Sequence, residues 1–211
     1  MNRRELLKNI VALTGFSLIG GEFLISGCKN EAAGSRTFTD KDLTLLNEIG
    51  ETIIPATDTP GAKAANVAQV MKDVVSDCYY PAHQKAFFDG IKNIDIAAKN
   101  KFQKDFLQLN PEQRHKLLVD LEKEAKAFNE KRNEADKIRR EKFDEENQKL
   151  PPGEQKLFQE APPHYYTLFK QLTLLGFFTS ETGLTETLRH ISVPGRYDGD
   201  VPYKKGMPAW E

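Results

Sequence analysis

The chain has 211 residues, of which 30 are lysine or arginine and 31 are aspartate or glutamate, so its net charge is −1 with histidine neutral. A balance this close to zero gives no electrostatic reason to expect a nucleic-acid partner, because binding a phosphate backbone requires excess positive charge. The chain is long enough to form one domain with its own hydrophobic core.

The first residues have the features of an export leader. Arg3 and Arg4, followed by two leucines and a lysine, resemble the twin-arginine signal of proteins that are exported already folded. The apolar run over residues 10–19 is too short to span a bilayer comfortably and follows a basic segment, which is typical of a signal peptide. We expect residues 1–27 to be removed, leaving 27 basic and 29 acidic residues.

The leader ends in a sequence that resembles a bacterial lipobox, Ile25-Ser26-Gly27-Cys28. We expect the Cys28 thiol to carry a diacylglycerol, and several acyl chains hold a protein durably at a membrane because each buried CH₂ contributes about 0.8 kcal/mol. Residues 28–38 would then be a lipidated tether. The alternative is an ordinary signal peptide with a chance cysteine. After lipidation only Cys78 is free, so no intramolecular disulfide can form, which fits folding in the reducing cytoplasm before export.

Helical patterns begin at Thr39, which is suited to cap a helix that Pro55 ends. Residues 55–62 combine prolines, an aspartate and a glycine, which is typical of a turn. A second helical run starts at Asn66 and resumes after Pro81, where we expect a kink because proline lacks a backbone donor.

The next helix has a strong start signal, with Asn110 as N-cap, proline at the first helical position and glutamine at the third. Residues 120–149 are mostly charged, with a narrow apolar stripe of Leu121, Phe128, Ala135 and Ile138. Mixed signs at i,i+4 spacing favour a solvated helix face over an interaction surface. A break follows at residues 151–153, and the nearly all-apolar run over residues 164–178 is expected at the centre of the core. The class is therefore all-α: one domain of about five or six helices over residues 39–211.

The usual cofactor motifs are missing from the sequence. There is no GxGxxG for a dinucleotide, no GxxxxGK[ST] for a nucleotide phosphate and no CxxCH for haem, and one free cysteine cannot ligate an iron–sulfur cluster. The four histidines lack metal-ligand spacing; they are His83, His115, His164 and His190. Three aspartates, Asp58, Asp198 and Asp200, offer acid/base chemistry in principle. The simpler interpretation is that Asp58 fixes its turn and that the other two shape the tail.

The C-terminal region combines a short helix with an extended tail. Thr179 or Ser180 is suited to cap a helix running through Arg189. The tail over residues 194–211 is rich in glycine, proline and aromatics and cannot bury itself as regular structure. It packs either across its own domain or across a partner, where tyrosine and tryptophan are favoured anchors.

With the twin-arginine leader, "IIPATDTPGA" over residues 53–62, "GFFTSETGLTETLRHISVPGRYDGDVPY" and a closing "GMPAW", the chain resembles the gluconate 2-dehydrogenase subunit 3 family. The resemblance implies a non-catalytic small subunit without a cofactor of its own. Its partner would be a large FAD-containing subunit of the glucose-methanol-choline type, in some cases with a cytochrome c subunit, acting on a sugar or polyol. The large subunit often lacks an export signal and is thought to cross the membrane with the small one. The lipobox at Cys28 departs from the general family pattern.

The resulting hypothesis is a periplasmic, lipid-anchored subunit that binds, co-exports and tethers a flavin dehydrogenase. The alternative is a stand-alone periplasmic lipoprotein that binds a carbohydrate or acts on it. We place the partner interface on the turn and the C-terminal region, at Pro55, Asp58, Pro60, Gly61, Phe178, Thr179, Arg189, Pro194, Gly195, Arg196, Tyr197, Tyr203 and Trp210.

Overall fold

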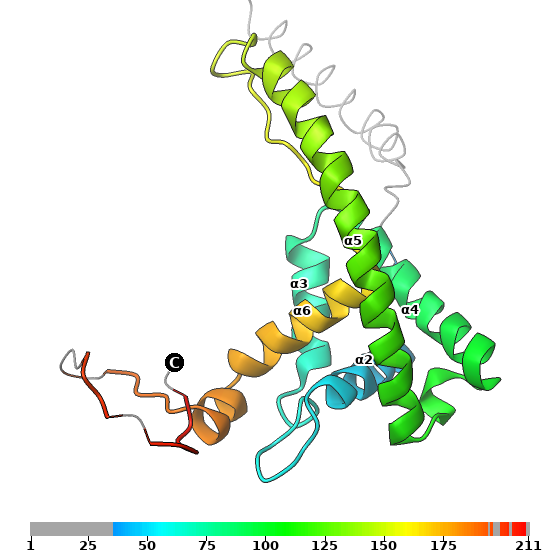
Figure 1. Cartoon of the computed structure of the whole chain (residues 1–211), viewed down its shortest axis with the longest axis vertical. Helices are drawn as coiled ribbons and strands as arrows, with labels where there is room; N and C mark the ends of the chain where they lie inside the picture. The colour runs from blue at the N-terminus through cyan, green and yellow to red at the C-terminus, as the bar shows by residue number, and fades with distance from the viewer. Residues whose placement is uncertain (1–35, 194, 196–198, 203, 210–211) are drawn as a thin grey trace, which may run out of the picture. The chain divides into compact units, whose positions relative to one another are not determined.

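The computed structural model describes residues 36–193, 195, 199–202 and 204–209 (Figure 1). The predicted export signal at Arg3 and Arg4 and the predicted lipid site at Cys28 lie outside these residues. The elements are α2 (Asp40–Ile53), α3 (Val67–Cys78), α4 (Pro81–Phe102), the 3₁₀ turn η1 (Phe106–Gln108), α5 (Pro111–Asn147), α6 (Tyr165–Phe178) and the π-helical turn η2 (Gly183–Thr187). The described residues contain no β-strand, which confirms the all-α class.

Two of the predicted helix starts form as expected. At the start of α2 the Thr39 hydroxyl accepts from the backbone N–H of Asp42, whose carboxylate accepts from the N–H of Thr39. Asn110 and Gln113 make the same reciprocal pair at the start of α5. Each pair satisfies backbone donors that the first turn of a helix leaves free, so both boundaries follow from local sequence.

The expected kink at Pro81 is wrong, because the helix stops and restarts there. α3 ends at Cys78, and Tyr80 has an extended backbone with φ −63° and ψ 152°. Pro81 is the first residue of α4. At this position a backbone N–H would have no partner within the helix, so a proline, which has no N–H, costs no hydrogen bond. Two separate helices therefore replace one bent helix.

Helix α6 lies at the centre of the core, as its apolar sequence predicted, and packs against α2, α3, α4 and α5 (Figure 1). Two glycines allow the closest approaches. A Cβ on Gly50 of α2 would lie 2.7 Å from Cγ2 of Val67, and a Cβ on Gly176 of α6 would lie 3.3 Å from Cβ of Val70. The backbones of α2 and α6 can therefore approach α3 only because these two positions carry no side chain.

Helix α5 begins in the core and continues as a charged helix. Beyond Ala125 its only buried residue is Asp136, and Phe128 and Ile138 of the predicted apolar stripe are exposed. This agrees with the expected solvated face, and α5 ends before the predicted break at residues 151–153.

The chain returns from α5 along residues 148–163, held by polar contacts. The Asn147 side chain accepts from the N–H of Lys156 at 2.8 Å and donates to its carbonyl at 2.9 Å. Arg140 lies over the ring of Phe158 at 4.7 Å. Hydrogen bonds and cation–π contacts thus accompany a single aromatic contact, between Phe143 and Phe158, whose ring centroids lie 5.4 Å apart.

Candidate partner interface

The turn between α2 and α3 is held by a carboxylate from the last turns of α2. Oε1 of Glu51 accepts from the N–H of Ala56 at 2.9 Å, and Oε2 accepts from the N–H of Lys63 at 2.9 Å. The N–H of Ala62 donates to the carbonyl of Ile54 at 2.9 Å and closes the turn. One ionised side chain therefore fastens both ends of residues 55–62, and hydrogen bonds to a charged acceptor are stronger than neutral ones.

Gly61 is the predicted interface residue that this arrangement requires. A Cβ there would lie 2.5 Å from the N atom of Ala56 and 2.5 Å from Oε1 of Glu51, so a side chain would collide with the carboxylate clamp. Pro55 and Asp58 are exposed, and Pro60 is half-buried. In the described part of the chain the Asp58 carboxylate has no hydrogen-bond or ion-pair partner, so Glu51 and not Asp58 fixes the turn. The turn is thus a surface feature in which the N–H of Thr57 donates to the carbonyl of Thr59 at 2.9 Å, while the Asp58 side chain between them makes no polar contact with the described residues.

A second carboxylate on α2 connects this region to α5. Glu48 forms ion pairs with Lys63, just after the turn, and with Arg114 of α5. Burial tends to raise the pKa of Glu48, but hydrogen bonds and charges from Lys63 and Arg114 outweigh it and lower the pKa below its usual value. Arg114 also donates to the carbonyls of Phe106 and Leu107. Glu48 therefore stays ionised and joins three segments that are distant in sequence.

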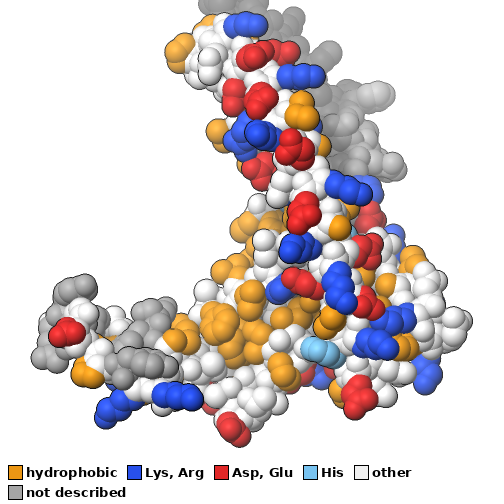
Figure 2. All heavy atoms as spheres, viewed as in Figure 1, with side chains coloured by type: hydrophobic (Ala, Val, Ile, Leu, Met, Phe, Trp, Pro, Cys, Tyr) orange, Lys and Arg blue, Asp and Glu red, His pale blue; other side chains and the backbone are white. Residues whose placement is uncertain are grey.

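The last turns of α6 carry exposed apolar side chains. Leu174, Leu175 and Phe178 are all exposed, and Figure 2 shows hydrophobic side chains gathered over α6. On the opposite side the same helix buries Thr173, Gly176 and Phe177 against the core. An apolar strip of this kind, made here of Leu174, Leu175 and Phe178, is more typical of a protein contact than of a free surface.

Helix α6 ends one residue before Thr179, and a π-helical turn follows. The Ser180 hydroxyl accepts from the N–H of Gly183 at 2.9 Å. Of the two caps that the sequence allowed, Thr179 and Ser180, Ser180 is therefore the one that forms. Thr179 is exposed, and its hydroxyl donates back to the carbonyl of Leu175. The predicted short helix forms over residues 181–187, partly as a π-helical turn, and ends two residues before Arg189.

The tail returns toward the π-helical turn. The backbone N–H of Arg189 donates to the carbonyl of Ala209 at 2.9 Å, which brings the end of the described chain beside the end of η2. Gly195 has φ of +70° and is exposed, a backbone conformation that glycine adopts most readily. The other predicted tail residues lie outside the described residues: Pro194, Arg196, Tyr197, Tyr203 and Trp210.

The structure brings some of the predicted interface together. A Cβ on Gly50 would lie 3.3 Å from Cβ of Ala62, at the end of the turn, and 3.7 Å from Cγ2 of Thr173 on α6. The end of the turn and α6 therefore both pack against α2 at Gly50. Phe178, Thr179 and Arg189 follow one another along α6, η2 and the segment after it.

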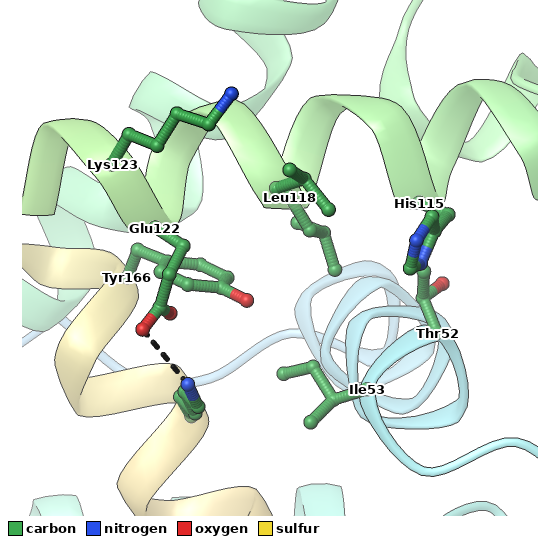
Figure 3. Close-up of a pocket in the computed structure, with 9 residues that line it drawn as sticks. Thr52, Ile53, His115, Leu118, Glu122, Lys123 and Tyr166 are labelled. Atoms are coloured by element: carbon green, nitrogen blue, oxygen red, sulfur yellow. Dashed lines mark hydrogen bonds and ion pairs between the residues drawn. The ribbon is translucent and has the colours of Figure 1, made fainter.

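A hollow of about 380 Å³ opens between α2, α5 and α6 (Figure 3). Its apolar walls include Ile53, Leu118 and Val119, and the Glu122–Lys170 ion pair lies at its edge. The phenol oxygen of Tyr166 points into it. Sequence reasoning assigned residues 164–178 to the core and so missed this site; the one signal was a tyrosine, whose hydroxyl usually finds a partner when buried.

Among the described residues no three His, Cys, Asp or Glu side chains lie together in a way that could hold a metal ion. His164 caps α6 by accepting from the N–H of Tyr166, and burial lowers its pKa despite the opposing charge of Glu124. No described helix is both long and apolar enough to cross a membrane. What the arrangement offers chemically is an ordered turn, an apolar strip and a hollow, which are features of recognition.

The sequence model of one protein family, described as gluconate 2-dehydrogenase subunit 3, matches residues 40–195. The match therefore covers most of the chain and includes the turn, α6 and the π-helical turn. No curated protein matches the chain. No solved structure matches it either.

Proposed function

Because the chain belongs to the gluconate 2-dehydrogenase subunit 3 family, the small subunit of a dehydrogenase complex, we propose that it binds, co-exports and membrane-tethers an FAD-containing large subunit. The hydride transfer from substrate to flavin takes place in that partner, which passes electrons on to a cytochrome or a quinone. This chain supplies the twin-arginine signal, the lipid at Cys28 and the docking surface.

The observation that carries the docking role is the apolar strip on α6. Leu175 is 47% exposed, and Leu174 and Phe178, on the same side of α6, are exposed as well. A partner that covers such side chains gains about 25 cal/mol of binding free energy for each Å² of apolar surface removed from water. The ordered turn at residues 55–62 and the π-helical turn extend the same proposal to the predicted interface residues on either side. A specific complex of this kind buries at least ~1,000 Å² in total.

The test of the proposal is a mild-detergent pull-down of the tagged native chain, followed by an absorbance spectrum of the material that comes with it. A stoichiometric partner that absorbs near ~450 nm, as oxidised flavins do, is the expected result. A colourless monomer would contradict the escort function and favour a solitary lipoprotein.

A matched pair of variants locates the interface. Leu175→Glu places a charge in the apolar strip and is expected to reduce the recovered flavin protein at least ~10-fold, because burying an unpaired carboxylate is costly. Ile96→Glu is the control, since Ile96 is 54% exposed on α4 and belongs to no proposed contact. Equal recovery with both variants would remove the strip from the interface.

A further inference from the structure

The first described residues are fastened to the side of α4. Nη2 of Arg36 donates to Oδ1 of Asp42 at 2.8 Å, and the guanidinium lies 5.2 Å from the centre of the Phe88 ring on α4. The ring of Phe38 lies 4.7 Å from the same ring. An ion pair, a cation–π contact and an aromatic contact therefore fix the start of the folded domain on α4.

The number of residues before Arg36 limits how far a lipid on Cys28 can be from this point. Arg36 follows Cys28 by eight residues, which span at most about 29 Å even when fully extended. Helix α4 has 22 residues and is about 33 Å long, so this stretch of chain is shorter than the helix to which it leads. A bilayer that holds the lipid is therefore within reach of the side of α4 on which Arg36 lies.

The same side of α4 carries a row of lysines. Lys85, Lys92 and Lys99 recur at intervals of seven residues, which places them on one face of the helix, and all three are exposed. Phe88, whose ring Arg36 contacts, lies three residues after Lys85 and four before Lys92, so it is a neighbour of both on the helix surface. The row therefore begins beside the point at which the domain is fastened to the preceding chain.

The positive charge of this row is only partly neutralised. Two of its three lysines pair with nearby aspartates. Lys92 between them and Lys104, just after α4, have no hydrogen-bond or ion-pair partner in the described part of the chain. Residues 81–105 contain five lysines and three aspartates, whereas the chain after removal of residues 1–27 has more acidic than basic residues. Excess positive charge is thus found next to Arg36, where an anionic lipid surface would attract it.

We propose that the lysine row of α4, together with Lys104, lies against the anionic headgroups of the bilayer that holds the Cys28 lipid. The proposal rests on the proposed function, whose lipid it requires, and adds to it an orientation of the domain. In Figure 1, α4 lies on one side of α5 and the C-terminal end of α6 lies on the other. The apolar strip at that end of α6 then points away from the membrane, and a large subunit docked on it does not meet the bilayer.

The experiment measures the orientation of the lipidated chain in vesicles that mix phosphatidylcholine with anionic phosphatidylglycerol. In a Cys78→Ser background, a fluorophore is attached through Asn93→Cys on α4 or through Gln171→Cys on α6, both of which are exposed positions. With a quencher on the lipid headgroups, we expect quenching at position 93 to be at least ~2-fold stronger than at position 171, because the attraction acts only near the surface. Equal quenching, or stronger quenching at position 171, would overturn the proposed orientation.

A matched pair of variants tests the lysines. Lys92→Gln/Lys104→Gln removes two charges from the proposed membrane face, and Lys137→Gln/Lys142→Gln removes two from exposed positions on α5. Each lysine near an anionic surface contributes roughly fivefold to binding, so the first variant should weaken the preference for this orientation by roughly 25-fold and equalise the two quenching signals. The α5 variant should behave as wild type.

The lipid composition separates this proposal from the proposed function. In vesicles of phosphatidylcholine alone, the chain should remain bound through its lipid while the difference between positions 93 and 171 disappears. A difference that persists there, or in Lys92→Gln/Lys104→Gln, would overturn the lysine contact and leave the lipid anchor intact. Failure of the wild-type chain to sediment with vesicles of either composition would instead overturn the membrane tether of the proposed function.

Discussion

The carboxylate clamp on the turn predicts that Gly61→Ala destabilises the protein although Gly61 has no unusual backbone angle. The new Cβ would lie 2.5 Å from Oε1 of Glu51 and 2.6 Å from its Oε2, so the carboxylate has to move away. That movement breaks its two bonds to the N–H groups of Ala56 and Lys63. At about 1–1.5 kcal/mol for each partly exposed charge-assisted bond, we expect a loss of about 2–3 kcal/mol.

The assay is urea unfolding of the mature chain, supported by thermal melting. A loss of 2–3 kcal/mol corresponds to a decrease in Tm of about 5–10 °C for a domain of this size. Gly153→Ala is the control, because a Cβ there meets nothing within 4 Å. In the double variant Glu51→Ala/Gly61→Ala the effects should add only in part, since both changes remove the same clamp while the clash of the new Cβ with the N atom of Ala56, at 2.5 Å, remains. A Gly61→Ala protein within ~0.5 kcal/mol of wild type, or full additivity, would refute the clamp.

Two further changes test neighbouring contacts. Gly183→Ala would place its Cβ against the backbone carbonyl of Phe177, which cannot turn away as a side chain can. We therefore expect the free energy of unfolding in urea to fall by about 3 kcal/mol and the amide exchange pattern over η2 to change. Wild-type stability would contradict the π-helical geometry. Glu48 has a lowered native pKa, so its ion pairs contribute fully above its unfolded value of about 4.5 and are lost as the pH falls through the native pKa. The stability difference between wild type and Glu48→Gln, about 1 kcal/mol at pH 7, should therefore close toward pH 3, and a difference that is constant with pH would show that the pairs are not the cause.

Local sequence predicted much of the helical architecture. The caps at Thr39 and Asn110, the break after α5 and the central place of α6 appear as expected. These features depend on short-range hydrogen bonding and on helical periodicity, both of which can be read from a few adjacent residues. The interruption at Pro81 was the exception, because a proline at this position is compatible with either a kink or a new helix start, and packing selects between them.

The candidate site was less predictable. The sequence identified the turn and the C-terminal motif as important, yet it attributed the turn to Asp58 and not to Glu51. The clamp joins Glu51 to Lys63, twelve residues apart, through the angle at which the chain leaves α2. No local pattern contains that angle.

The sequence by itself determined that this is an all-α chain of the gluconate 2-dehydrogenase subunit 3 family, since helix signals and family motifs are linear properties. Only the tertiary structure decided that Tyr166, in an apolar helix expected to be core, turns its hydroxyl into an open hollow, and that Leu174, Leu175 and Phe178 remain in solvent. Whether a side chain on α6 is covered depends on where α2, α3, α4 and α5 pack around it, and that arrangement is set by long-range contacts such as the close approach at Gly176.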